Sequence, residues 1–258
     1  MPLVSVVIPT YRHADFILQT LDSVFAQKFT DYETIVINDG SPDDTAASLA
    51  PLAKAGKIRY FEQSNGGQAI ARNRGIREAS GEFVALLDDD DLWPPDKLAW
   101  QVESLHQHPR AVGVWGYRVI LNDPAQLPKP ERAMPADEIQ RRVRRRQIMA
   151  SPGQALFRAD ALRAVGGYDP SLWGCDDWDM LIRLATLGPL VYSHQLALHY
   201  RWHRQNASSN VGRLYANLIK LHRKHHGILP RGGFADWAAC LGYIHAYSAK
   251  QVLLRAKS

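Results

Sequence analysis

Continuous apolar blocks alternate with amphipathic blocks along the first 120 positions of the chain. The apolar, β-branched blocks predict buried strands at 3–10, 32–39, 57–63, 81–88 and 111–121. The amphipathic blocks predict helices at 14–27, 40–53, 66–80 and 94–108. Strands and helices in this alternation are typical of an α/β fold, here a mostly parallel, Rossmann-like sheet flanked by helices.

The regular alternation ends after Leu121. Residues 122–135 are rich in proline and predict a loop, and residues 141–146, RRVRRR, hold five arginines in six positions. The rest of the pattern predicts a helix around CDDWDMLIRLATLG, a strand at 189–202, and helices around 210–226 and 234–254. We therefore expect one α/β unit with an irregular middle and C-terminal helices.

Length, charge and cysteine content narrow the class of protein. The 258 residues suffice for one large domain or two small ones, and two cysteines give no disulfide framework, which fits a reducing cytosol. The first residues lack the basic lead of a signal peptide, and no apolar run approaches the roughly 20 residues that span a bilayer. The net charge of +5 combines −6 over residues 1–100 with +11 over residues 101–258. We expect a cytoplasmic protein whose acidic half binds metal and whose basic half meets anions.

Four consecutive carboxylates, Asp88 to Asp91, follow the fourth predicted strand. A hard divalent cation takes oxygen ligands, often one or two carboxylates together with phosphate and water. A D-x-D unit of Asp88 and Asp90 can therefore bind both a metal and a ribose hydroxyl. The alternative is a solvated turn that caps the next helix, for which one or two aspartates would suffice. The cluster favours the metal site.

Polar residues also follow the first two predicted strands, at Thr10-Tyr11 and at Asp39. Ligands of open α/β sheets bind beyond the carboxyl ends of the strands, so these residues should converge with Asp88. Asp39 can cap the next helix or accept from the N–H of a base such as uracil. The glycine-rich residues 64–75 permit close approach of a nucleotide but match no phosphate-binding fingerprint. Together the strand ends favour a nucleotide.

Six segments stand in order along residues 3–210: VSVVIPTYRHADFILQTLDSVFAQ, YETIVINDGSPDDT, NGGQAIARNRGIREASGEFVALLDDDDLWPPDKL, VGGYDPSL, CDDWDMLIRLA and YRWHRQNASSN. In this order and spacing the chain resembles the family 2 inverting glycosyltransferases of GT-A fold. The resemblance implies that residues 1–120 bind a nucleotide-sugar and that residues 121–210 bind the acceptor and carry the catalytic base. Residues 211–258 would form a helical extension.

The resemblance also implies the donor and metal sites. A nucleotide-sugar, with UDP favoured over dTDP and GDP, would contact Pro9, Thr10, Tyr11, Asp39, Asn65, Gly67, Arg72, Asp88 and Asp89. Asp90 and His203 would bind a divalent cation, Mn²⁺ or Mg²⁺. Taken alone, His203 has the alternative of a purely structural role.

On the acceptor side, Asp177 matches the position of the family's catalytic base. Without the resemblance, Asp177 would be taken for the solvated start of a helix. The family commonly has Glu at the preceding position, where this chain has the shorter Asp176. Asp176, Trp178 and Arg201 would face the acceptor, a hydroxyl of a glycan or of a lipid-linked glycan.

This residue set suits a single displacement at an anomeric carbon. One carboxylate must take the proton of the attacking hydroxyl, and a divalent cation neutralises the leaving diphosphate, so no second carboxylate acid is required. A glycoside hydrolase needs two carboxylates that flank the scissile bond. The residues therefore favour a transferase.

The sequence leaves open the roles of the arginine run at 141–146 and of the tryptophans. The run is a solvated face, a site for an anionic acceptor, or a peripheral contact with the inner face of a membrane. Nucleic acid is disfavoured because no aromatic side chains interleave with the arginines to stack bases. Tryptophans that either fill the core or stack on a sugar are Trp93, Trp115, Trp173 and Trp178.

Other classes of protein compete with the transferase. A nucleotidyltransferase would need a Gly-rich, Lys/Arg-bearing loop after the first strand, and an aspartyl phosphatase would place its nucleophile there; PTYRHAD is neither. A non-catalytic nucleotide-sugar-binding relative would lack a base, whereas Asp177 is present. A dehydrogenase would need the dinucleotide fingerprint.

Overall fold

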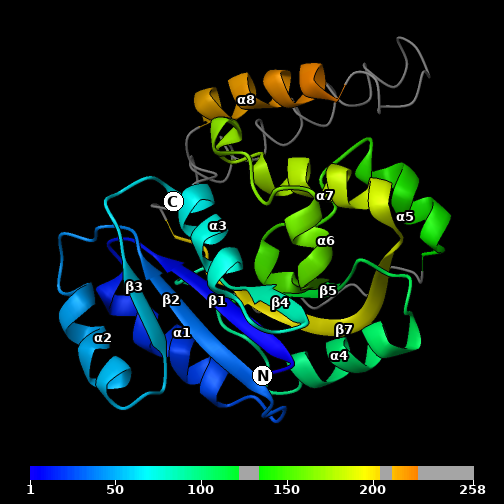
Figure 1. Ribbon diagram of the computed structural model, residues 1–258. Helices are drawn as coiled ribbons and strands as arrows, with labels where there is room; N and C mark the ends of the chain where they lie inside the picture. Colours follow the sequence, from blue (N-terminus) through cyan, green and yellow to red (C-terminus); the bar gives the residue numbers. More distant parts are fainter. Residues whose placement is uncertain (122–133, 204–210, 226–258) are drawn as a thin grey trace.

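The computed structural model describes residues 1–121, 134–203 and 211–225. Within these residues the strands form one seven-stranded sheet of order β3-β2-β1-β4-β6-β5-β7 (Figure 1). The strands are β1 (Val4–Thr10), β2 (Tyr32–Asn38), β3 (Arg59–Glu62), β4 (Phe83–Leu86), β5 (Gly113–Ile120), β6 (Ala155–Arg158) and β7 (Leu190–Tyr200). Neighbouring strands are parallel except that β6 runs antiparallel to both β4 and β5.

Helices cover both faces of the sheet. They are α1 (Ala14–Phe25), α2 (Thr45–Lys54), α3 (Gln68–Glu78), α4 (Lys97–Gln107), α5 (Ala136–Val143), α6 (Ala159–Ala164), α7 (Asp176–Leu187) and α8 (Val211–Lys224), with short 3-10 helices at Pro152–Gln154 and Pro170–Leu172. In Figure 1, α1, α2 and α4 lie on one side of the sheet, and α3, α6 and α7 lie on the other, with α8 beyond them.

The apolar runs of the central strands fill two cores at once. Along β1, Val6 and Ile8 join the core under α1, α2 and α4, whereas Val7 joins the core under α3, α6 and α7. In β4, Ala85 and Leu86 divide between the two cores in the same way. Because successive side chains of a strand point to opposite faces, only a strand covered on both sides needs an unbroken apolar run.

The chain order reverses at β1, which pairs with β2 on one side and with β4 on the other. All three strands end at the same edge, and the backbone N–H of Asp39 donates to the carbonyl of Thr10 at 2.9 Å. This is the edge at which open α/β sheets bind ligands. The strand order therefore gathers the polar strand ends that the sequence separates.

The mostly parallel α/β architecture that was predicted is confirmed, and the sequence pattern missed parts of the middle. The strand β6 and the helices α5 and α6 lie where no regular element was expected. The strand has four residues, too short to display a period. The predicted helix at 234–254 and residues 122–133 of the predicted loop lie outside the described residues.

The arginine run begins on α5, which packs through Ile139 and Val143. Arg141 and Arg142 make i,i+4 ion pairs with Asp137 and Glu138, at 2.7 and 2.5 Å. Part of the run is therefore the solvated face of an amphipathic helix. Such exposed pairs contribute little to stability.

A buried carboxylate connects α7 to the end of α8. Asp179 is fully buried and pairs with Arg183 at 2.5 Å, with Lys224 at 2.8 Å and with His225 at 2.7 Å. These contacts hold α8 against the α7 layer (Figure 1).

Among the described residues, no helix has the length and apolar character needed to cross a bilayer.

A close helix–strand contact gives the first testable prediction. Gly75 of α3 lies on β1, and a Cβ atom at this position would stand 2.1 Å from Cγ1 of the buried Val7. We expect Gly75→Ala to destabilise the protein by about 2 kcal/mol, since overpacking a rigid core displaces backbone. Urea unfolding measures this, with Gly212→Ala as the control, because a Cβ at Gly212 of α8 meets no atom within 4 Å. Equal stability of the two variants would show that α3 does not pack this closely.

Candidate active site

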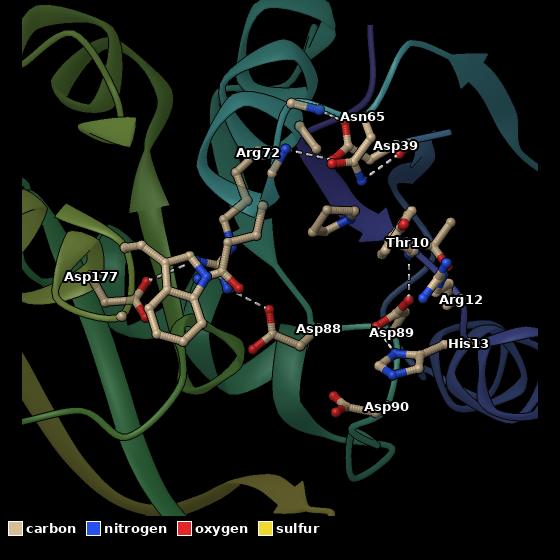
Figure 2. Close-up of a pocket in the computed structure, with 18 of the residues that line it drawn as sticks. Thr10, Arg12, His13, Asp39, Asn65, Arg72, Asp88, Asp89, Asp90 and Asp177 are labelled. Carbon is tan, nitrogen blue, oxygen red and sulfur yellow. Dashed lines mark hydrogen bonds and ion pairs between the residues drawn. The ribbon is translucent and has the colours of Figure 1, made fainter. Parts of the chain in front are cut away.

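A cavity of about 870 Å³ opens where β1, β2 and β4 end. The predicted site residues that line it are Pro9, Thr10, Tyr11, Asp39, Asn65, Gly67, Arg72, Asp88, Asp89, Asp90 and Asp177. In the view of Figure 2, Asp88 lies between Asp177 on one side and Asp89 on the other. The structure therefore brings the separated strand ends and the start of α7 into one site.

Asp39 organises the glycine-rich loop before α3. Its Oδ1 accepts from Gln63 Nε2 at 2.7 Å and from the N–H of Gly66 at 3.0 Å, and its Oδ2 accepts from the N–H of Gly67 at 2.7 Å. Gly67 has φ +90°, a conformation that L side chains rarely adopt and that aims its N–H at Asp39. A carboxylate oxygen accepts two hydrogen bonds, so Oδ2 keeps one acceptor position for a ligand.

Asp89 supports the segment that follows β1. Its carboxylate accepts from the backbone N–H of Tyr11 at 3.2 Å, and His13 Nδ1 lies 2.7 Å from its other oxygen. The hydrogen bond to Asp89 raises the pKa of His13, and burial raises the pKa of Asp89. A carboxylate that binds one imidazole nitrogen orients the other, an arrangement usual behind metal-ligating histidines.

His13, Asp90 and His203 form a cluster in which one ligand atom from each lies within 4.8 Å of the others. His203 Nε2 is 2.8 Å from Asp90 Oδ2, and the two histidine rings meet edge to face with centroids 5.6 Å apart. His13 follows β1, Asp90 follows β4 and His203 follows β7. Two imidazoles and a carboxylate are a donor set that can hold a divalent transition metal.

Arg72 of α3 binds three carboxylates with one guanidinium. Its Nη2 is 2.6 Å from Asp88 Oδ1, and its Nη1 is 3.3 Å from both Asp176 Oδ2 and Asp177 Oδ1. The Arg72 side chain is 2% exposed. Its guanidinium lies over the ring of Tyr168, with Cζ 5.1 Å from the ring centroid. Asp88, at the end of β4, and the start of α7 are thus joined through one buried cation.

The environment of Asp177 suits a base that works near neutral pH. Its pKa is raised to about 7: burial raises it most, Arg72 lowers it, and Asp176 and Asp88 contribute to the rise. Its side chain is 18% exposed and lines the cavity, whereas Asp176 is fully buried. Asp177 is therefore accessible to a ligand, and its raised pKa suits a general base that works near neutral pH.

Four predicted residues do not line the cavity directly. His203 reaches it through Asp90, and Asp176 lies beneath Asp177, where it accepts from Gly174 N–H at 3.0 Å. Arg201 donates to the carbonyl of Asp90 at 2.8 Å and to Gln19 at 2.9 Å, so it braces the end of β7.

The acceptor-facing position expected for Trp178 is wrong. The side chain is 1% exposed, packs in the core and donates from Nε1 to the carbonyl of Val143 at 2.6 Å. Adjacent residues of a helix point in different directions, so Trp178 of α7 faces the core while its neighbour Asp177 faces the cavity. Trp93 and Trp115 are also core residues, whereas Trp173 lines the cavity.

The fourth carboxylate of the acidic run also points away from the cavity. Asp91 is fully buried, accepts from the backbone N–H of Arg201 at 2.8 Å and lies 3.3 Å from Ser151 Oγ. Its backbone carbonyl, like that of Asp89, accepts from Thr20 Oγ1 at 2.9 Å. Asp91 holds the strand end in place, and the ligand-facing carboxylates are Asp88, Asp89 and Asp90.

Sequence reasoning also missed several residues of the site. His13 had one signal, its place three residues beyond the first strand, and nothing in the sequence pairs it with His203. Other cavity residues that were not predicted are Arg12, Gly66, Gln68, Ala71, Gln147, Ala150, Gly174, Tyr200, Arg213, Leu214 and Leu218. Arg213 of α8 lies over the ring of Trp173 at 4.4 Å, so this wall pairs an aromatic face with a cation.

Solved structures of glycosyltransferases share this fold. Residues across 85% of the chain superpose on 65% of TarS 1–349 from S. aureus, bound to UDP-GlcNAc, with a TM-score of 0.71 at 17% identity. The whole chain superposes on 76% of the mannosyltransferase PcManGT from Pyrobaculum calidifontis, bound to GDP-Man and Mn²⁺, with a TM-score of 0.68 at 20% identity. The protein therefore has the GT-A fold that the motifs predicted.

Sequence comparison identifies the family. A putative teichuronic acid biosynthesis glycosyltransferase of Bacillus subtilis, TuaG, is 37% identical over 131 residues, half of this chain and 52% of TuaG. The chain spans about a third of the length of several other curated relatives that it matches. The model of the family "Glycosyl transferase family 2" matches residues 5–166, which run from the second residue of β1 through α6 and include the acidic strand end. This chain belongs to glycosyltransferase family 2.

Proposed function

We propose that the protein is a metal-dependent, inverting glycosyltransferase that moves a sugar from a nucleoside-diphosphate sugar to a hydroxyl of a glycan or lipid-linked glycan. The observation that carries this proposal is the single cavity that joins the strand-end carboxylates, the His13–Asp90–His203 cluster and Asp177. The cavity thus offers residues of suitable chemistry to bind a nucleotide, to hold a metal and to act as a base.

Asp177 is the proposed general base. The acceptor oxygen attacks the anomeric carbon, the bond from that carbon to the diphosphate oxygen breaks, and the acceptor proton passes to Asp177. Arg72 occupies only Oδ1 of Asp177, which leaves Oδ2 for the acceptor hydroxyl. Attack from the side opposite the leaving group inverts the configuration, and one base suffices for it.

His13, Asp90 and His203 are the proposed metal ligands. The donor set fits Mn²⁺ or a similar divalent cation, and Asp89 holds His13 as outer-shell carboxylates hold ligating imidazoles. When bound, the metal supplies positive charge that neutralises the departing diphosphate. The chain itself contributes the fixed positions of the three ligands, which come from the ends of three different strands.

The proposed donor is a UDP-sugar, with GDP- and dTDP-sugars as the alternatives. Asp39 keeps an acceptor position on Oδ2 for the N–H of a base, and the structural neighbours hold UDP-GlcNAc and GDP-Man. The likeness to TuaG, named for teichuronic acid biosynthesis, supports a polysaccharide acceptor. The residues of the acceptor side would include Trp173 and Arg213.

Calorimetric titration of nucleotides tests the proposal directly. We expect one of UDP, GDP, dTDP and CDP to bind in the presence of Mn²⁺ at least tenfold more tightly than in EDTA, because a cation held by His13, Asp90 and His203 would supply positive charge to the diphosphate. Binding of the same nucleotide with equal affinity in EDTA would contradict the proposed dependence on a metal. Failure of all four to bind would contradict the donor site and leave a non-catalytic relative.

A further inference from the structure

Arg72 lies where the donor side and the acceptor side of the cavity meet. Its guanidinium donates to Asp88, at the end of β4, and to Asp176 and Asp177, at the start of α7. Asp88 stands 88 positions before Asp176 along the chain. Three of the five N–H donors of this guanidinium are directed at these carboxylates, and its buried Nε has no partner among the described residues.

We infer that Arg72 is a positioning residue for the general base: its guanidinium, which Asp88 and Asp176 also hold, fixes the orientation of Asp177. The inference rests on the proposed function, in which Asp177 takes the acceptor proton. It replaces the direct donor contact that the sequence resemblance implied for Arg72 with an action through Asp177.

Burial and geometry carry the argument. Arg72 is nearly solvent-free, so its charge acts on Asp177 with little screening, and its planar fork fixes the direction of Asp177 Oδ1. Asp176 is fully buried and anchored by Gly174 N–H, so it holds the other side of the same Nη1. The shorter side chain at Asp176 therefore still reaches the guanidinium, although the family commonly has Glu there.

The charges that face Asp177 come from every side of the site. Arg72 from α3 lowers the pKa of Asp177, and Asp176 from α7 and Asp88 from the end of β4 raise it. Tyr168 lies beside them and also lowers the pKa of Asp177, while its own pKa is raised by burial. Arg213 lines the same cavity. Removal of Arg72 should therefore raise the pKa of Asp177 and favour its protonated form. Removal of Asp176 should lower that pKa and favour the ionised form.

Carboxyl-carbon NMR titration tests the inference without turnover. The Asp177 resonance is assigned by its loss in Asp177→Asn. We expect its midpoint to rise by at least about one pH unit in Arg72→Gln, to fall in Asp176→Asn, and to stay near the wild-type value in Arg72→Lys. Opposite shifts from two neighbouring substitutions cannot arise from general loosening of the fold. If Arg72→Gln does not fold, Asp176→Asn and Arg72→Lys retain the comparison.

Arg183→Lys is the matched control. Arg183 is a half-buried arginine of α7 that binds Asp179 and the carbonyls of Val165 and Gly167, away from the cavity. Its loss should lower stability and leave the midpoint of Asp177 unchanged. An unchanged midpoint in a folded Arg72→Gln, or a rise in Asp176→Asn, would overturn the inference.

Kinetics separate positioning from donor binding. With UDP-GlcNAc and GDP-mannose as donors and water as acceptor, we expect Arg72→Lys to lower kcat about 100-fold and to change the donor KM less than threefold. A large rise in KM at unchanged kcat would return Arg72 to the donor site. If the wild type releases no nucleotide from either sugar, the proposed function is in question, while the NMR shifts still decide the action of Arg72 on Asp177.

Discussion

Asp177→Asn is expected to lower turnover about 10³-fold and to leave the affinity for the nucleotide with Mn²⁺ within about twofold. The amide keeps the shape of the carboxylate and removes its capacity to take a proton. Arg72 remains satisfied by Asp88 and Asp176, so the site should keep its structure. Nucleotide release from the sugar donor measures turnover, and calorimetry measures affinity.

The control for this variant is Asp160→Asn. Asp160 also stands in the first turn of a helix, α6, but is exposed and does not line the cavity. If Asp177 only capped its helix, the two variants would lose similar stability and neither would lose turnover. Loss of nucleotide binding in Asp177→Asn would move Asp177 to the donor site, and unchanged turnover would assign the proton transfer to another group.

Removal of a cluster ligand should have the second largest effect. We expect Asp90→Asn and His203→Gln each to weaken Mn²⁺-dependent nucleotide binding about 100-fold, because each removes one of three atoms that lie within 4.8 Å of one another. His13→Gln should have an effect of the same order, although only the structure pairs this residue with His203. Titration with the nucleotide at saturating Mn²⁺ provides the measurement, and the affinity in EDTA should change little.

The matched histidine control is His194→Gln on β7, outside the cluster. Its affinity should equal that of the wild type. If Asp90→Asn and His203→Gln lose affinity and His13→Gln does not, His13 serves only to hold Asp89. If none of the three variants differs from the control, the cluster is an ordinary buried hydrogen-bond group and the metal must be held elsewhere.

Most of the fold was readable from the chain because its central strands are buried on both faces. The apolar runs that contain Val7 and Leu86 have no polar alternation, and that pattern belongs to a parallel sheet with helices on both sides. The reversal of chain order at β1 then follows from ordinary α/β topology. The short strand β6 was missed because four residues cannot display a period and its pairing partners are distant in sequence.

The site divides in the same way. Residues directly after predicted strands, such as Thr10, Asp39 and Asp88, were found because strand ends of one sheet converge by geometry. The acidic run was found as a whole, but its members serve different purposes. Asp91 turns inward to hold Arg201, while Asp90 faces the cavity, because successive side chains point in different directions.

By itself the sequence determined the α/β class, the ligand-binding edge of the sheet and the motifs that mark the family, since each depends on local pattern and order along the chain. Only the tertiary structure decided which distant side chains act together. His13 meets His203 and Arg72 meets Asp177 through packing between elements more than a hundred residues apart. Contacts of that range depend on the placement of whole helices and strands, and local sequence does not encode that placement.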